Sequence, residues 1–264
     1  MPENLSSVWL NELTWQEVEE YLQEESIILL PVGSTEQHGP AGPLGLDTYV
    51  AIALAEDTAE KKEVLTVPPL WFGDSSHHLG FPGSISLKTE TLNSVIKDVV
   101  SSLARGGFDK FLVINGHKGA NLAAVSTALK TLHEEEFPEK IMALADPLHL
   151  SAGISPQIKE TNEHHAGELE ISHIWHKYPR LIKEDKLTET GVDLKEELSP
   201  FAREDLMDPS GDYIEVFWNS EEQREFAPEG SFSPSAKASK EKGRKYHEYM
   251  VERLSEFIDW MRQA

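Results

Sequence analysis

The sequence predicts an α/β fold with three layers, in which helices cover both faces of a largely parallel central sheet. Two observations lead to this prediction. Short runs that are apolar throughout alternate with longer stretches whose apolar residues recur at helical spacing. Strands of this kind are typical of βαβ units, because the helices bury both faces of the sheet. No repeat or flexible linker divides the chain, so we expect a single domain over residues 1–264.

The first helix and strand are predicted near the N-terminus. Thr14 is followed three residues later by Glu17, a capping box that predicts a helix extending to about Glu25. Residues 26–32 (SIILLPV) are apolar and rich in branched side chains, which predicts a buried strand. We expect Asp47 to cap the next helix, where apolar residues again recur at helical spacing.

The middle of the chain continues the alternation. Residues 63–70 (EVLTVPPL) predict a second strand that ends at its prolines. An apolar stripe over residues 92–103 predicts a helix that stops at Gly106 and Gly107. Residues 110–115 (KFLVIN) then predict a third buried strand.

The remaining sequence adds a fourth strand and a less regular region. Residues 120–136 predict a helix, and residues 140–145 (KIMALA) predict a strand. Over residues 181–234 the periodicity weakens while acidic residues and prolines dominate, so we expect an irregular excursion that serves as a lid or a subunit contact. Apolar residues at helical spacing over residues 246–261 predict a terminal helix that packs against the sheet.

Composition limits the class of partner. A formal net charge of -22 at pH 7 would repel phosphate groups, so it argues against nucleic acid and acidic membranes, and is otherwise typical of a solvated surface. The absence of cysteine excludes disulfides and thiolate ligands. The sequence shows no signal-peptide pattern and no apolar run of the ~20 residues that a membrane helix needs. We therefore expect a soluble cytoplasmic protein.

Imidazole and carboxylate side chains gather in three motifs near strand ends and helix starts. Glu36 and His38 are two residues apart, so they face the same side of an extended backbone. Asp47, at a helix start, could bridge two cations, and His117 follows a strand with glycine beside it. Residues 165–170 (HAGELE) add a histidine and two glutamates. These side chains suit zinc and manganese, and ligands of such sheets bind beyond the carboxyl ends of the strands, so the motifs predict a paired divalent-metal site.

Each motif taken alone has a simpler interpretation. A Glu-x-His pattern also occurs without a metal, residues 115–117 (NGH) resemble a turn, and His165 could be a buried residue with satisfied hydrogen bonds. Their occurrence together, in this order and at strand ends, favours the metal site.

The same motifs resemble the creatininase (creatinine amidohydrolase) family, whose pattern includes PVGSxEQHGPHLPLxTD, HxxFPGT, NGHGGN and HAGxxETS. The resemblance extends from about residue 8 to residue 260 and is most specific in the first motif. The corresponding segments here are residues 31–40, 44–48, 78–84, 115–117, 165–172 and 230–234.

The resemblance implies a role for each motif residue. Glu170, rather than Glu168, aligns with the glutamate of the last motif, although the residues alone leave both open. His165 corresponds to the histidine near the substrate, which would act as a general acid, and Ser76 and His78 fall where the pattern lines the pocket. The implied ligands of two divalent cations, with Asp47 as the bridge, are Glu36, His38, Asp47, His117 and Glu170. Zinc suits such ligands best, and manganese or iron could occupy one position.

The chain departs from the family pattern after His117. Lys118 stands where the pattern has glycine, and Asn121 comes one position later than the asparagine of the pattern. Creatininases proper carry a glutamate two positions after this histidine, where this chain has Gly119. We expect Lys118 to be a substrate-binding cation at the entrance of the site, which suits an anionic or hydroxylated substrate better than creatinine.

The resemblance implies a metal-dependent hydrolase that opens a small cyclic amide or removes a formyl group with a metal-activated water. It also implies a homo-oligomer, commonly a hexamer. Hydrolysis of a keto-inositol, 3-dehydro-scyllo-inosose, at the same site is the alternative reaction. A metal- or ligand-binding protein without catalysis is the alternative class, although such a protein would not need His165 beside the full ligand set.

Overall fold

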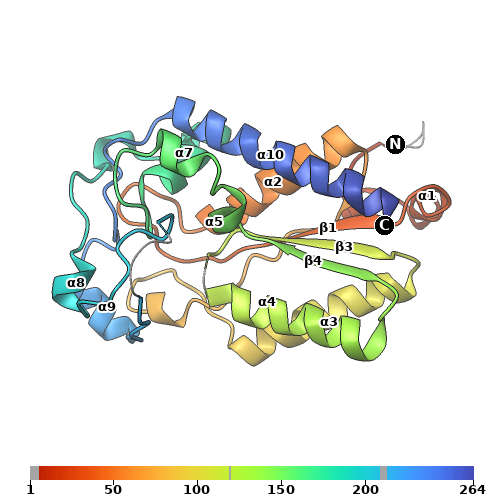
Figure 1. Ribbon diagram of the computed structural model, residues 1–264, viewed down its shortest axis with the longest axis horizontal. Coiled ribbons are helices and arrows are strands. Elements are labelled where there is room, and N and C mark those ends of the chain that lie inside the picture. Colours follow the sequence, from red (N-terminus) through yellow and green to blue (C-terminus); the bar gives the residue numbers. More distant parts are fainter. Residues whose placement is uncertain (1–5, 119, 209–212) are drawn as a thin grey trace.

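A computed structural model describes residues 6–118, 120–208 and 213–264. Within these residues the sheet has four strands in the order β2-β1-β3-β4, and every neighbouring pair is parallel. Figure 1 shows the sheet between two layers of helices, so the expected three-layer α/β fold is confirmed. The strands are β1 (Ile27–Val32), β2 (Leu65–Thr66), β3 (Lys110–Asn115) and β4 (Ile141–Ala145).

Two apolar clusters bury the two faces of the sheet. One face packs against α2 (Leu46–Lys62), α7 (Glu168–Lys177) and α10 (Lys240–Gln263). The other packs against α3 (Thr89–Arg105) and α4 (Ala120–Thr131). The shorter helices are α1 (Trp15–Tyr21), α5 (Pro147–Leu150), α6 (Ser155–Ile158), α8 (Leu194–Glu197) and α9 (Ser220–Phe226). Single turns are η1 (Leu10–Glu12), η2 (Ser76–His78), η3 (Leu132–Glu136), η4 (Pro179–Leu181) and η5 (Glu184–Lys186).

Most expected elements are present, with shifts at their ends. The capping box at Thr14 forms, but α1 ends at Tyr21 rather than near residue 25. Strand β2 is only two residues long, because the two prolines that follow at 68 and 69 carry no N–H for a sheet hydrogen bond. Asp47 does not cap α2, since Gly45 occupies the N-cap and Asp47 lies inside the first turn.

The irregular region predicted over residues 181–234 contains α8 and α9 and two single turns in its described part. A small apolar cluster that includes Leu194, Ala227 and Phe232 holds it together. Figure 1 shows α8 and α9 at the end of the molecule opposite α1 and the C-terminus. Its proposed role as a lid or subunit contact stays a prediction.

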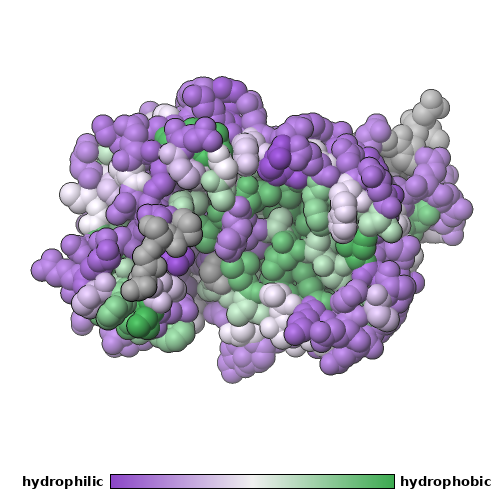
Figure 2. Space-filling model, viewed as in Figure 1, coloured by the Kyte–Doolittle hydropathy of each residue, from purple (hydrophilic) through white to green (hydrophobic). Residues whose placement is uncertain are grey.

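Strand β4 is the edge of the described sheet, and each of its five residues is only partly buried. Figure 2 shows an apolar surface between α10 and α4, over this side of the sheet. Among the residues that the structure describes, none of the helices is long and apolar enough to cross a membrane.

Candidate metal centre

Glu36 and His38 lie in the loop that leaves β1. The loop turns sharply, and Gly42 N donates to His38 O at 3.1 Å. Gly33 lets the end of β1 lie against α2, because a Cβ at this position would overlap Thr48. The Glu36 and His38 side chains are consequently buried beside the first turn of α2.

Asp47 and His117 meet because α2 packs closely against the end of β3. Asp47 lies in the first helical turn, where the partial positive charge of the helix N-terminus favours a carboxylate. A Cβ at Gly116 would overlap the carbonyl oxygen of Asp47, so glycine is required for this approach. The packing places His117 Nδ1 3.0 Å from Asp47 Oδ2.

His165 and Glu170 lie on either side of the start of α7. Ala166 between them has a φ of 56°, a left-handed conformation that side chains rarely adopt. The Ala166 N–H donates to Glu170 Oε2 at 2.8 Å, which fixes the Glu170 carboxylate toward the preceding turn.

The five expected ligands form two overlapping groups. Glu36, Asp47 and His117 each place one ligand atom within 4.8 Å of the others, which we call the first ligand group. His38, Asp47 and Glu170 do the same and form the second ligand group. Asp47 belongs to both groups, which is the arrangement expected of a carboxylate that bridges two cations.

Unpartnered oxygen atoms show that these residues fit a cation. Within the described part of the chain, both carboxylate oxygens of Glu36 and Oδ2 of Asp47 are buried without a hydrogen-bond partner. Imidazole nitrogens lie 3.0–3.4 Å from these oxygens, but they are not aligned as hydrogen-bond donors to them. Burying carboxylate oxygens in this way is costly, and a bound divalent cation would compensate that cost.

Backbone carbonyls orient the two histidines that are candidate ligands. His38 Nδ1 contacts the carbonyl oxygen of Glu36 at 3.2 Å, and His117 Nε2 contacts that of Asp74 at 3.0 Å. The other ring nitrogen of each histidine faces Asp47, at 3.1 and 3.0 Å. Metal-binding histidines commonly have one nitrogen anchored in this way, because the contact fixes the ring and the tautomer.

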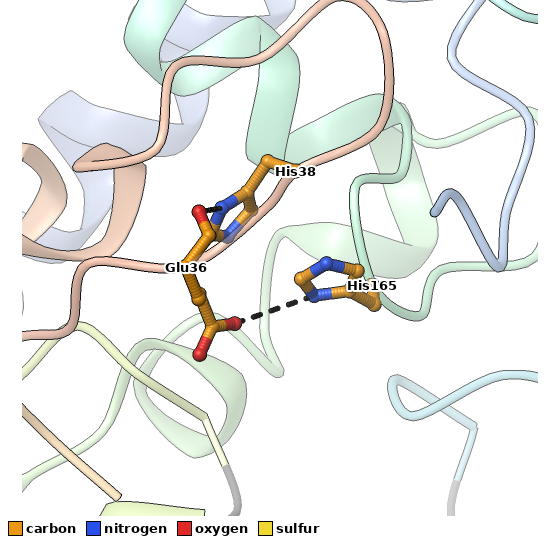
Figure 3. A group of neighbouring side chains, drawn as sticks. All are labelled: Glu36, His38 and His165. Atoms are coloured by element: carbon orange, nitrogen blue, oxygen red, sulfur yellow. Dashed lines mark hydrogen bonds and ion pairs between the residues drawn. The ribbon is translucent and has the colours of Figure 1, made fainter. Parts of the chain in front are cut away.

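His165 has the same kind of anchor but faces Glu36 (Figure 3). Its Nε2 lies 2.7 Å from the backbone carbonyl oxygen of Gln37 and 2.9 Å from the side-chain amide nitrogen of the same residue, and its Nδ1 lies 3.7 Å from Glu36 Oε1. Burial, and then the neighbouring rings of His78 and His38, lower the pKa of His165 well below its usual value. The ring is therefore neutral, and with Nε2 donating to the carbonyl oxygen of Gln37, the shorter of the two contacts, Nδ1 faces the cluster without a proton. Nδ1 can accept a proton from a group in the cluster. His165 can act as a general acid only after it has accepted that proton.

His78 lies beside the cluster with its ring proton on the side of Glu36. Its Nε2 lies 3.1 Å from Glu36 Oε1, while the amide nitrogens of Gln37 and Gln223 lie 3.0 and 2.8 Å from its Nδ1. An amide nitrogen only donates, so Nδ1 accepts and the ring proton is on Nε2, toward Glu36. Gln223 comes from α9, so the irregular region contributes to the wall of this site.

The metal-free cluster holds protons that a cation must displace. Burial opposes the imidazolium charge, but the carboxylates led by Asp47 and Glu36 outweigh it and raise the pKa of His38 to about 9 and of His117 to about 10. Both rings are therefore protonated at pH 7 in the absence of metal. We expect metal binding to release protons and the apparent affinity to increase as the pH rises toward 9 to 10. Calorimetric titration with Zn²⁺ in two buffers of different ionisation enthalpy counts the released protons. Binding without proton release at pH 7 would contradict these protonation states.

Of the residues expected to contact the substrate, Lys118 lies differently from the prediction, whereas the role of Ser76 stays a prediction. Lys118 is not at an entrance, because its side chain is 8% exposed and its Nζ lies 3.0 Å from Glu170 Oε1. The buried carboxylates of Glu170 and Glu163 attract it inward, and together they outweigh burial and raise the pKa of Lys118. Ser76 is exposed at the start of the turn that carries His78. Gly119 lies outside the residues that the structure describes.

The two glutamates of the last motif have different surroundings. Glu168 Oε2 accepts the N–H groups of Glu160 and Thr161 at 2.9 and 3.0 Å, and its Oε1 pairs with Lys242. Glu168 therefore fixes the loop before α7, whereas Glu170 belongs to the second ligand group.

Two asparagines for which no role was predicted, Asn115 and Asn121, hold the surrounding loops together. Asn115 donates to Asp146 Oδ2 at 3.0 Å. Asn121 donates to the carbonyl oxygen of Gly33 at 3.0 Å and accepts the N–H of Asp74 at 2.9 Å. The signal available in the sequence was an asparagine at a strand end and a second one at the start of the following helix.

The described cavities do not mark this centre. A groove of about 480 Å³ lies between α3 and residues 67–70, and its lining is mainly apolar. None of the five ligands lines it. The donor atoms, rather than a cavity, therefore identify the site.

Comparison with known proteins gives matches over most of the chain. The creatininase family profile, described as creatinine amidohydrolase, matches residues 11–258.

A 3-dehydro-scyllo-inosose hydrolase of Thermotoga maritima is 34% identical over 116 residues, which are 44% of this chain and 37% of that protein. A mycofactocin precursor peptide peptidase of Mycolicibacterium smegmatis is 32% identical over 167 residues, 61% of this chain and 62% of the relative. The creatinine amidohydrolase of Pseudomonas putida is 28% identical over 69% of this chain and 76% of its own length. The first two alignments thus span less than two thirds of the relatives.

Solved structures share the fold over nearly the whole chain. A creatinine amidohydrolase (creatininase) crystal structure superposes with a TM-score of 0.77 at 23% identity, covering 96% of this chain and 97% of that one. A mutant creatininase described as Zn-Zn type gives a TM-score of 0.76 at 25% identity, with 96% and 98% covered.

Proposed function

This chain belongs to the creatininase family, and we propose that it is a metal-dependent hydrolase of a small polar molecule. The observation that supports this most strongly is the pair of buried ligand groups that share Asp47. When bound, divalent cations supply Lewis-acid activation of water and of the substrate carbonyl.

Two cations would be held by the two ligand groups, with Asp47 between them. Imidazole and carboxylate donors suit zinc best, and manganese or iron can replace it in one position. A Zn-Zn form of a structurally similar creatininase supports this choice.

The chain's own residues would orient the reactants and carry the proton. His165 Nδ1 is unprotonated and faces the cluster, so it accepts the proton lost by the attacking water. The same nitrogen returns that proton to the leaving nitrogen when the C–N bond breaks. His78 places its Nε2 3.1 Å from Glu36 Oε1 and so adds a polar group beside this carboxylate.

The substrate that we propose is a small cyclic amide or a formamide. Creatinine itself is disfavoured, because the glutamate that follows the NGH motif in creatininases proper is replaced by Gly119. The alternative is C–C cleavage of a keto-inosose, which the Thermotoga maritima relative supports by its 34% identity. A peptide bond is a further possibility within the C–N class, given the mycobacterial relative.

We also propose that the protein is a homo-oligomer. The partly buried apolar edge strand β4 and the surface beside it support this, because unpaired edges of this kind commonly pair with another chain. The cytoplasmic location stays a prediction from the sequence.

Activity assays test the proposed function directly. Zn²⁺- or Mn²⁺-loaded protein should hydrolyse at least one member of a panel of cyclic amides, formamides, keto-inososes and short peptides, and a chelator should remove that activity. Creatinine turnover with kcat/KM of ~10⁴ M⁻¹s⁻¹ or more would refute the predicted specificity. Tight metal binding with no turnover of any class would favour the non-catalytic alternative.

A further inference from the structure

Lys118 is a buried cation in direct contact with the second ligand group. Its Nζ lies 3.0 Å from Glu170 Oε1, and both side chains are largely buried, at 8% and 6% exposure. The other oxygen of the same carboxylate, Glu170 Oε2, accepts the Ala166 N–H at 2.8 Å. Both oxygens of this ligand therefore already have partners.

The first ligand group is different in this respect. Within the described residues, neither carboxylate oxygen of Glu36 has a hydrogen-bond partner, nor does Asp47 Oδ2. No lysine or arginine forms a described ion pair with Glu36 or Asp47, whose ion-pair partners in the described part are all histidines. The oxygens of the first group therefore face only imidazoles, which can release their protons when a cation binds, whereas the oxygens of Glu170 face an ammonium group and a backbone N–H.

The ammonium group beside Glu170 should make the cation affinities of the two ligand groups very different. A divalent cation at the second ligand group would have to share Glu170 with an ammonium group, and like charges repel strongly where water is excluded. Glu163 accepts the Glu170 N–H at 3.1 Å and provides a further buried carboxyl group near the ammonium. Lys118 is therefore well placed to remain where it is when the first cation binds.

We propose that the two cation positions are unequal: the first ligand group binds a divalent cation tightly, and Lys118 acts as a resident positive charge that weakens binding at the second group. This inference rests on the proposed function, because it concerns the same metal centre. The family pattern has glycine at this position, so the inequality is a property of this chain's own sequence.

Manganese titration of the metal-free protein tests the proposal without measuring activity. The electron paramagnetic resonance signal of free Mn²⁺ counts the bound ions at each concentration. For the wild type we expect one tight site and a second site at least ~30-fold weaker. In Lys118→Met the Kd of the second site should fall at least ~10-fold, with the first changing by less than ~3-fold, because the repulsion acts mainly on the second group.

A matched control separates this effect from the loss of any lysine that pairs with a buried glutamate. Lys242 of α10 pairs with Glu168, which lies in the same first turn of α7 as Glu170. Glu168 lies outside both ligand groups. Lys242→Met should therefore leave both Mn²⁺ affinities unchanged, and Lys118→Arg should keep the inequality because it keeps the charge. If Lys118→Met folds poorly without metal, its melting temperature should rise more on adding Mn²⁺ than that of the wild type, since a second cation then replaces the ammonium.

The outcomes distinguish this inference from the proposed function. Two ions bound by the wild type with equal affinity, or an unchanged second site in Lys118→Met, would overturn the inequality alone. Failure of the wild type to bind any Mn²⁺ or Zn²⁺ would instead overturn the metal-dependent function.

Discussion

Asp47→Asn should lose both cations and reduce kcat/KM at least ~10³-fold. Asp47 is the ligand common to both groups, and a neutral amide offers one oxygen and no charge to hold two cations. Elemental analysis after gel filtration would measure the bound metal, and the activity panel would measure turnover.

Asp57→Asn provides a matched control in the same helix. Asp57 forms ion pairs with Lys177 at 2.6 Å and with His247 at 2.7 Å. These contacts link α2 to α7 and α10 and do not involve the ligand groups. This variant should retain the metal content of the wild type. If Asp47→Asn also bound two ions with wild-type affinity, Asp47 would not be the bridge.

His165→Ala should retain its fold and metal but lose at least ~100-fold in turnover, the usual contribution of a positioned acid–base group. The imidazole presents an unprotonated Nδ1 to the cluster, and alanine cannot accept the proton that the attacking water releases. Metal content and steady-state kinetics of the same preparation would measure the two effects separately.

The structure also places His165 in a group with Glu36 and His38 whose ligand atoms lie within 4.8 Å of one another. Loss of one cation together with activity would therefore identify His165 as a ligand rather than a proton carrier. His176→Ala in the last part of α7 is the control, and it should change neither quantity.

The regular parts of the fold could be predicted because their signals are local. Residues 110–115 form β3 as expected, since a central parallel strand is apolar on both faces. Helix α3 follows its apolar stripe and ends at Gly106. Strand β2 was overestimated because its pairing is limited by prolines and by the neighbouring loops, which periodicity does not show.

The gathering of the candidate ligand side chains could be predicted from motifs, but their surroundings could not. The carbonyl groups of Glu36 and Asp74 orient His38 and His117, and their positions depend on loop conformations that side-chain patterns do not specify. Gln223 contacts His78 across 145 residues of sequence, from a helix in the irregular region.

The direction of a charged side chain was also beyond the sequence. Lys118 was expected at the entrance because it directly follows the NGH motif, and a lysine usually keeps its charge in water. In the structure Glu170 and Glu163 draw it inward. A buried partner for a lysine becomes visible only when distant segments are placed together.

Anomalous diffraction at the zinc edge, from crystals grown with saturating Zn²⁺, tests the metal centre most directly. We predict an anomalous peak bounded by Glu36, Asp47 and His117, at the ~2.0–2.2 Å expected for Zn–N and Zn–O bonds. Saturated crystals without a peak among these three side chains would contradict the assignment of this cluster as a metal centre.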